Sequence, residues 1–198
     1  SMASKDQRSS HLIEVMISST TVDLPQHRRS AIDAVWRSDL FPIAMERDDT
    51  ADPDNAAIYS RKLAEEADVY VGIFAHRYGS IPRGSSISYT ELEYRRAAER
   101  KIPILIFMSQ GDAPVAPDDR EADPAKAAQL ARLKDELRAQ HKVGTFTSPE
   151  DLGNKIYFAL RRLMDDGRIA TPAPHTSPHA RSVNIIPTPP DPYFAHPY

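Results

Sequence analysis

The chain has 198 residues, of which 27% are charged, and its formal net charge is −3. This length suffices for one α/β domain and a tail, and the mild acidity without a block of basic residues argues against a nucleic-acid partner. The chain has no cysteine, which excludes disulfide and thiolate chemistry. No apolar run approaches the roughly 20 residues of a membrane span, so we expect a cytoplasmic protein with no membrane partner.

Short apolar runs alternate with helical patterns along the first half of the chain. Asp23 is a candidate N-cap for the first expected helix, and Pro25 fits its first turn. The elements expected here are, in order, a strand at 11–19, a helix at 21–39, a strand at 40–46, a helix at 52–67 and a strand at 68–76.

The second half repeats the alternation. Ser148 is placed to cap the last helix, and Gly167 is placed to end it. The elements expected here are, in order, a helix at 88–101, a strand at 102–108, a helix at 124–141, a strand at 143–147 and a helix at 148–167.

This alternation predicts an α/β fold. Strands that alternate with helices form a parallel sheet through right-handed crossovers. The third and fourth expected strands are apolar on both faces, as strands buried under helices are. For five strands we expect a flavodoxin-like three-layer sandwich with the sheet order 2-1-3-4-5.

The composition divides the chain into three parts. Residues 1–10 are polar and expected to be disordered, whereas residues 11–167 hold the expected elements. Eight of the seventeen prolines fall in the last 32 residues, a composition that cannot build a core. Residues 168–198 therefore read as a proline-rich linker to a further, downstream module. His175 and His179 lie in this tail, where no helix aligns them, and we expect no metal site.

A crevice is expected where the first and third strands end, because the chain winds away from them in opposite directions. Ser18, Ser19 and Thr20 follow the first strand and can bind an anion at the next helix or simply cap that helix. Arg77 and Tyr78 follow the third strand and can hold a phosphate and stack on a base, or form an ordinary turn. No glycine-rich phosphate loop occurs, which argues against a dehydrogenase-type dinucleotide site.

Two glutamates begin the helix beside this crevice. If Ser88 is the N-cap, Glu91 falls at the third helical position and completes a capping box, which gives it a structural role. Glu93 lies beyond that position and can point into the crevice. Glu93 is therefore the leading candidate for a catalytic or ligand-contacting group, with Glu91 second.

Three ordered stretches resemble a known family. "VMISSTTVDLPQHRRSAIDAV", "DVYVGIFAHRYGS" and "SYTELEYRRAAERKIPILIF" resemble the TIR-like domain of unknown function at the N-terminus of STAND-type ATPases of the NACHT or NB-ARC kind. The resemblance covers residues 11–166. It implies a flavodoxin-like sheet and a multidomain protein with a role in signalling or bacterial defence.

The resemblance also implies a chemistry. Enzymatic TIR domains split NAD with a glutamate on the helix before strand four, and nucleoside deoxyribosyltransferases place a glutamate in a similar motif, which Thr90, Glu93, Ala97 and Pro103 match. NAD or a related nucleotide would be a substrate, and no cofactor would be bound permanently.

Three functions stay open at this point. The first is an effector that cleaves NAD when it is oligomerised through a downstream ATPase module. The second is a non-catalytic module that self-associates or recruits other signalling proteins, and the third is a nucleoside deoxyribosyltransferase-like enzyme. We expect the isolated domain to be largely monomeric and at most weakly active.

Overall fold

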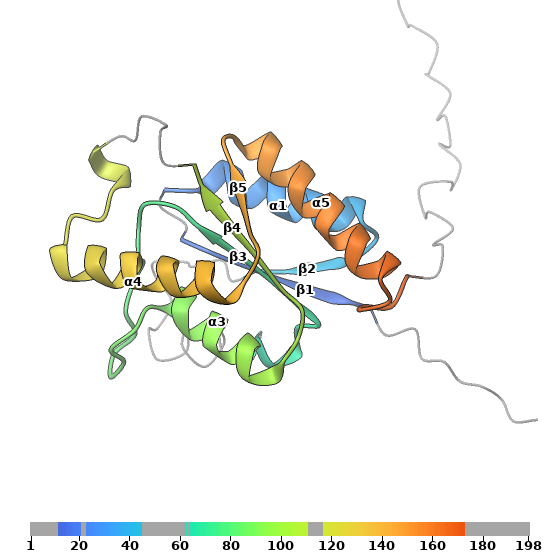
Figure 1. Cartoon of the computed structure of the whole chain (residues 1–198), viewed down its shortest axis with the longest axis horizontal. Helices are drawn as coiled ribbons and strands as arrows, with labels where there is room; N and C mark the ends of the chain where they lie inside the picture. The colour runs from blue at the N-terminus through green and yellow to red at the C-terminus, as the bar shows by residue number, and fades with distance from the viewer. Residues whose placement is uncertain (1–11, 21–22, 45–61, 63, 111–116, 173–198) are drawn as a thin grey trace, which may run out of the picture.

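Figure 1 shows a computed structural model of the chain, which describes residues 12–20, 23–44, 62, 64–110 and 117–172. The expectations for residues 1–10, for most of the helix at 52–67 and for the tail from residue 173 onward lie outside these ranges. Lys62 and Ala64–Glu66 are helical.

A five-stranded parallel sheet forms the centre of the domain. Its order is β2-β1-β3-β4-β5, and every neighbouring pair is parallel, which confirms the flavodoxin-like fold expected from the sequence. The strands are β1 (Glu14–Ser19), β2 (Phe41–Ile43), β3 (Val69–Phe74), β4 (Ile104–Ser109) and β5 (Val143–Phe146).

Helices cover both faces of the sheet. Helices α1 and α5 lie on one face and α3 and α4 on the other (Figure 1). No helix in the described part of the chain is long and apolar enough to cross a membrane. The helices are α1 (Pro25–Arg37), α3 (Tyr89–Arg100), α4 (Pro124–Gln140) and α5 (Pro149–Asp165), with a short 3-10 helix η1 (Pro117–Asp119).

Side-chain caps begin three of these helices. Ser88, Asp123 and Ser148 each accept a hydrogen bond from a backbone N–H of the first turn of α3, α4 and α5. The expected cap of α1 was wrong, because Leu24 occupies the N-cap position without a side-chain bond. The Asp23 carboxylate instead accepts from the Thr20 hydroxyl and, at 3.2 Å, from the backbone N–H of His76 after β3.

Strand alternation divides the core into two clusters. Successive side chains of a strand point to opposite faces, so Val15 and Ile17 pack toward α1 and α5, whereas Met16 packs toward α3 and α4. On the α3 face, a Cβ at Gly72 would lie 2.8 Å from ring atoms of both Tyr70 and Phe74. The absence of a side chain at Gly72 therefore lets the Tyr70 and Phe74 rings close over β3.

The folded part extends past the expected boundary at Gly167. Gly167 adopts φ 67° and ends α5, with its N–H bonded to Met164 O and the N–H of Arg168 bonded to Leu163 O, both at 2.9 Å. The next residue, Ile169, is only 8% exposed and belongs to the core cluster of α1 and α5. Residues 168 and 169 are thus part of the domain and not of the linker.

Truncation tests this boundary. A chain that ends at Ala170 should melt like the full chain, because it keeps Ile169 in the core. A chain that ends at Gly167 should melt about 5 °C lower, since burying an isoleucine contributes roughly 1.5–3 kcal/mol. Thermal unfolding followed by circular dichroism measures both, and equal melting temperatures for the two truncated chains would contradict the assignment.

Candidate functional site

The structure joins Glu93 of α3 to Ser18 near the end of β1. The Ser18 hydroxyl donates a hydrogen bond of 2.5 Å to Glu93 Oε2. Both residues are buried, with Ser18 1% and Glu93 5% exposed. Ser18 points to the α3 side of the sheet because it shares that face with Met16, and helical spacing turns Glu93 toward the sheet. A carboxylate thus lies under α3 at the crevice expected from the sheet order.

A tyrosine hydroxyl lies beside this pair. Ser18 pairs with Gly72 across β1 and β3, and a Cβ at Gly72 would lie 3.1 Å from the Tyr70 hydroxyl. This buried hydroxyl has no hydrogen bond of good geometry within the described part of the chain. Burial, followed by the charge of Glu93, raises the pKa of Tyr70 well above its ordinary value, and the nearby Ser18 hydroxyl opposes the shift. Tyr70 is therefore a neutral donor next to the carboxylate.

Thr90, at the start of α3, contributes a second unused hydroxyl. Its Oγ1 is buried and has no hydrogen-bond partner among the described residues. A Cβ at Gly79 would lie 3.8 Å from this oxygen and 3.1 Å from Cγ2 of Thr20. Gly79 has φ 92°, a conformation that favours glycine. The loop after β3 can therefore pass between Thr20 and Thr90, so that three segments meet at the site.

The other two hydroxyls after β1 are committed to internal bonds. Ser19 Oγ accepts from the Arg28 guanidinium at 3.2 Å, and the Thr20 hydroxyl donates to Asp23. Both side chains are buried. Ser19 and Thr20 thus fix the loop between β1 and α1 in this structure.

Glu91 points away from Glu93 and is held by three partners. Tyr78 donates to its carboxylate at 2.5 Å, and Arg95 and Arg132 each donate at 2.9 Å. Ser88 Oγ accepts from the Glu91 N–H at 3.2 Å, as a capping box requires, but the Ser88 N–H donates to the Tyr78 hydroxyl and not to Glu91. Burial opposes its ionisation, but the bonds from Tyr78, Arg132 and Arg95 hold the pKa of Glu91 below its ordinary value. Glu91 therefore ties α3 to α4 and to the loop after β3.

The two residues expected to line the crevice after β3 differ in placement. Tyr78 is 1% exposed, and its hydroxyl is bonded to Glu91, so its ring belongs to the core beneath α3 and α4. Burial, then the hydrogen bond with Glu91, raises the pKa of Tyr78. Arg77 is half-buried and makes no hydrogen bond within the described residues.

Sequence reasoning missed three residues that the structure brings to this site. Tyr70 was read only as part of a buried strand, although the small residue two positions later, Gly72, leaves space above the strand. Asp23 was read as a helix cap. Thr90 was considered only as part of the motif around Glu93, and its buried, unpartnered hydroxyl is visible only in the structure.

The comparison with protein families covers most of the chain. Residues 14–161 match the family described as Domain of unknown function (DUF4062). The chain belongs to the DUF4062 family. The match spans all five strands and ends within α5, so it includes every residue of the candidate site. No curated protein matches the chain.

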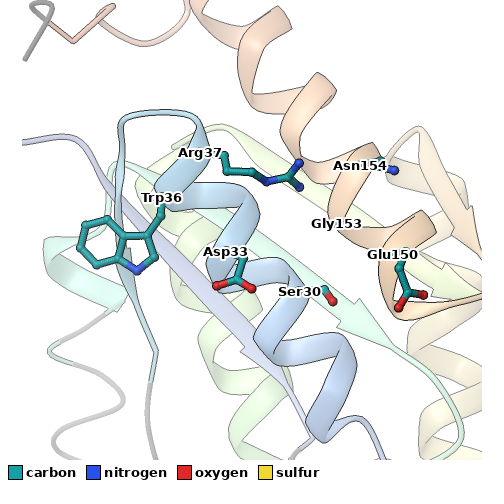
Figure 2. A pocket seen from close by; sticks show the side chains of 7 residues that line it. All are labelled: Ser30, Asp33, Trp36, Arg37, Glu150, Gly153 and Asn154. Carbon is teal, nitrogen blue, oxygen red and sulfur yellow. The ribbon is translucent and has the colours of Figure 1, made fainter. Parts of the chain in front are cut away.

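The DUF4062 domain has a further pocket on the opposite face of the sheet (Figure 2). It holds about 560 Å³ between α1 and α5. Arg37 reaches from α1 toward α5, and its guanidinium lies 5.4 Å from the centroid of the Tyr157 ring. None of the residues expected at the crevice lines this pocket, whose lining residues are Ser30, Asp33, Trp36, Arg37, Glu150, Gly153 and Asn154.

The described part of the DUF4062 domain contains no group of three or more His, Asp or Glu side chains that could hold a metal ion. The described residues of the candidate site include one carboxylate, that of Glu93, and the hydroxyls of Ser18, Tyr70 and Thr90. Such a set can accept from and donate to the hydroxyl groups of a sugar, and its charge can stabilise a cation.

Glu91→Ala should destabilise the DUF4062 domain by about 1–3 kcal/mol. It leaves the buried Tyr78 hydroxyl without its acceptor and removes the anchor of Arg132 and Arg95. Glu99→Ala on the exposed side of α3 is the matched control and should change stability by less than about 0.5 kcal/mol. Urea unfolding measures both, and equal midpoints for the two variants would contradict a structural role for Glu91.

Stability should also fall as the pH decreases below the ordinary histidine pKa of 6.5. Burial is the largest effect on His27, His76 and His141 and lowers the pKa of each below 6.5. In the window between those lowered values and 6.5 the unfolded chain binds protons that the folded chain does not, so stability is lost with falling pH. Urea midpoints between pH 8 and pH 5 measure this. Replacing His76 by glutamine should weaken the dependence, and a midpoint that stays constant would exclude it.

Proposed function

We propose that the DUF4062 domain is a TIR-like module that binds a nucleotide at the Ser18–Glu93 site and cleaves the N-glycosidic bond of NAD when the protein is assembled. It would be the N-terminal part of a multidomain STAND-type protein with a signalling or defence role. One observation carries the proposal. A buried carboxylate at the carboxyl end of β1 is flanked by two buried hydroxyls, of Tyr70 and Thr90, that have no hydrogen-bond partner among the described residues.

Unpartnered buried hydroxyls favour a ligand. Most buried polar side chains in proteins are hydrogen-bonded, so the Thr90 hydroxyl without a partner among the described residues, and the Tyr70 hydroxyl with no bond of good geometry, favour a ligand beside the carboxylate. A ribose fits this set, because its hydroxyls can donate to Glu93 and accept from Tyr70 and Thr90.

The chemistry requires only one fixed carboxylate. The bond between C1′ of the ribose and nicotinamide breaks with its electron pair going to nicotinamide, which leaves as a neutral molecule. Positive charge then develops on the ribose ring, and a fixed carboxylate in a site that excludes water stabilises that charge. Water forms the new bond to C1′ and releases a proton. In this scheme Ser18 orients the carboxylate through its hydrogen bond.

The burial of the site fits low activity in the isolated domain. Ser18, Tyr70, Thr90 and Glu93 are each at most 5% exposed, so a ligand reaches them only when the neighbouring segments rearrange. Assembly through a downstream module would supply that rearrangement. This step rests on the resemblance to activated TIR domains and on the burial of the site.

The alternative is a non-catalytic module that self-associates or recruits a partner. In its favour, Trp36, Phe41 and Phe158 are 52%, 37% and 68% exposed, and Trp36 and Phe41 pack edge to face. No described contact covers these side chains or indicates a partner for them. The buried site under α3 therefore supports the nucleotide proposal more directly.

Glu93→Gln should reduce NAD cleavage by the assembled protein roughly 100-fold, the scale lost when one electrostatic stabiliser of a transition state is removed. The amide keeps the shape of the side chain and can still accept from Ser18, so the fold should survive. Release of nicotinamide, measured by chromatography, gives the rate, and thermal unfolding verifies the fold.

Glu99→Gln is the matched control, because Glu99 lies on the same helix with its side chain 66% exposed. It should leave the rate unchanged. Cleavage at the wild-type rate by a folded Glu93→Gln variant would exclude Glu93 from the chemistry. An assembled wild-type protein that cleaves no NAD and binds no nucleotide would favour the interaction module.

A further inference from the structure

A second pocket lies at the carboxyl end of β3, on the same edge of the sheet as the Glu93 site. It holds about 430 Å³ between α4 and the segment that carries Arg120 and Glu121. That segment is fixed to the end of β3, because the Glu121 N–H donates to the His76 carbonyl at 2.9 Å. The lining residues are Ala75, His76, Arg120, Glu121, Ala127, Leu130, Ala131 and Lys134.

Lys134 is the most constrained cation of this pocket. Its ammonium donates to the backbone carbonyl of Ala75, and the described residues offer it no ion pair. Burial, followed by the neighbouring charge of Arg138, lowers the pKa of Lys134, while Asp23 opposes the shift. An ammonium group has three donors, so this one retains capacity for a further acceptor in the pocket.

Two more donors line the same space. Within the described part of the chain, neither the Arg120 guanidinium nor the His76 ring has a hydrogen-bond partner. Burial is the largest effect on His76 and lowers its pKa. The charges of Lys134 and Arg120 lower this pKa further, whereas the charges of Asp23 and Asp119 raise it. Three basic residues thus line one pocket.

Two of the acidic groups nearby, Asp23 and Glu121, are already engaged, whereas Asp119 acts on His76 through its charge. Asp23 accepts from Thr20 and from the His76 N–H, and Glu121 accepts from the Tyr78 N–H at 3.1 Å. Their charges reduce the positive potential of the pocket, but their bonds point into the surrounding loops. The donors of Lys134, Arg120 and His76 are the groups left to meet a ligand.

We propose that this pocket binds the phosphate group of a nucleotide whose ribose lies at Glu93. The ribose end of this inference rests on the proposed function, whereas the phosphate contact is carried by Lys134, Arg120 and His76 alone. A phosphate is the best match, because its several acceptor oxygens can meet the ammonium, the guanidinium and the imidazole together.

The loops that carry the two sites are linked by named contacts. Asp23 binds Thr20 on one side and the His76 N–H on the other. Thr20 also lies against Gly79, which is next to Thr90 above the Glu93 site. The same loops thus border both sites, and an extended ligand would have to displace part of these contacts to reach from Glu93 to Lys134.

The pocket distinguishes NAD cleavage from a nucleoside deoxyribosyltransferase-like activity, two of the three functions considered from the sequence. A nucleoside deoxyribosyltransferase-like enzyme acts on a sugar without phosphate and has no use for a basic pocket beside its carboxylate. NAD carries a diphosphate next to the ribose that would be cleaved. The basic pocket thus specifies a phosphorylated nucleotide as the class of substrate.

Calorimetric titration of the full chain with inorganic pyrophosphate, ADP and adenosine tests this inference. Pyrophosphate and ADP should bind, and Lys134→Met should weaken both roughly tenfold or more, the scale of one lost charge-assisted hydrogen bond. Binding of adenosine, which has no phosphate, should not depend on Lys134. Arg120 is exposed, so Arg120→Gln should leave the fold intact. This variant should also weaken the binding of pyrophosphate.

Lys155→Met on α5 is the matched control, since it removes the same charge from the other face of the sheet. It should leave pyrophosphate binding unchanged. The phosphate site is overturned if pyrophosphate does not bind, or if it binds wild type, Lys134→Met and Arg120→Gln equally. If pyrophosphate binding depends on Lys134 but NAD cleavage is unchanged by Glu93→Gln, the phosphate site is supported and the proposed role of Glu93 in cleavage is rejected.

Discussion

Helix α3 buries two carboxylates within its first five residues, and the arrangement of the α3 and α4 side of the domain follows from how each is satisfied. Glu91 receives Tyr78 from the loop after β3 and Arg132 from α4, so one carboxylate joins three segments. Glu93 faces the other way and receives Ser18 from β1. A buried carboxylate is costly unless it is paired or hydrogen-bonded, so these contacts fix the position of α3 on the sheet.

The two carboxylates differ in their described partners. Glu91 is held by two guanidinium groups and a phenol, which saturates it and suits a structural link. Glu93 accepts a hydrogen bond from the neutral Ser18 hydroxyl near the carboxyl end of β1, the edge of the sheet where small molecules bind in folds of this kind. The same helix thus carries a structural glutamate and a candidate functional one, two positions apart.

Two glycines give the site its space, each for a different reason. Gly72 has no side chain where the Tyr70 ring must lie, so the tyrosine hydroxyl can approach Ser18. Gly79 adopts a positive φ and brings the loop after β3 between Thr20 and Thr90. Together with Asp23, which binds both Thr20 and the His76 N–H, they hold the ends of β1 and β3 close together.

The sequence by itself determined the fold class and the caps at Ser88 and Ser148, because these depend on periodicity and local spacing. The sheet order was expected only as the commoner choice for five strands, and the structure confirmed it. Only the tertiary structure decided which residues contact one another. Asp23 links two loops and does not cap a helix. Tyr78 is buried and donates a hydrogen bond to Glu91, and Ile169 packs in the core. Each of these outcomes depends on atoms more than five residues apart in sequence, and local spacing contains no information about which distant donor will reach a buried acceptor.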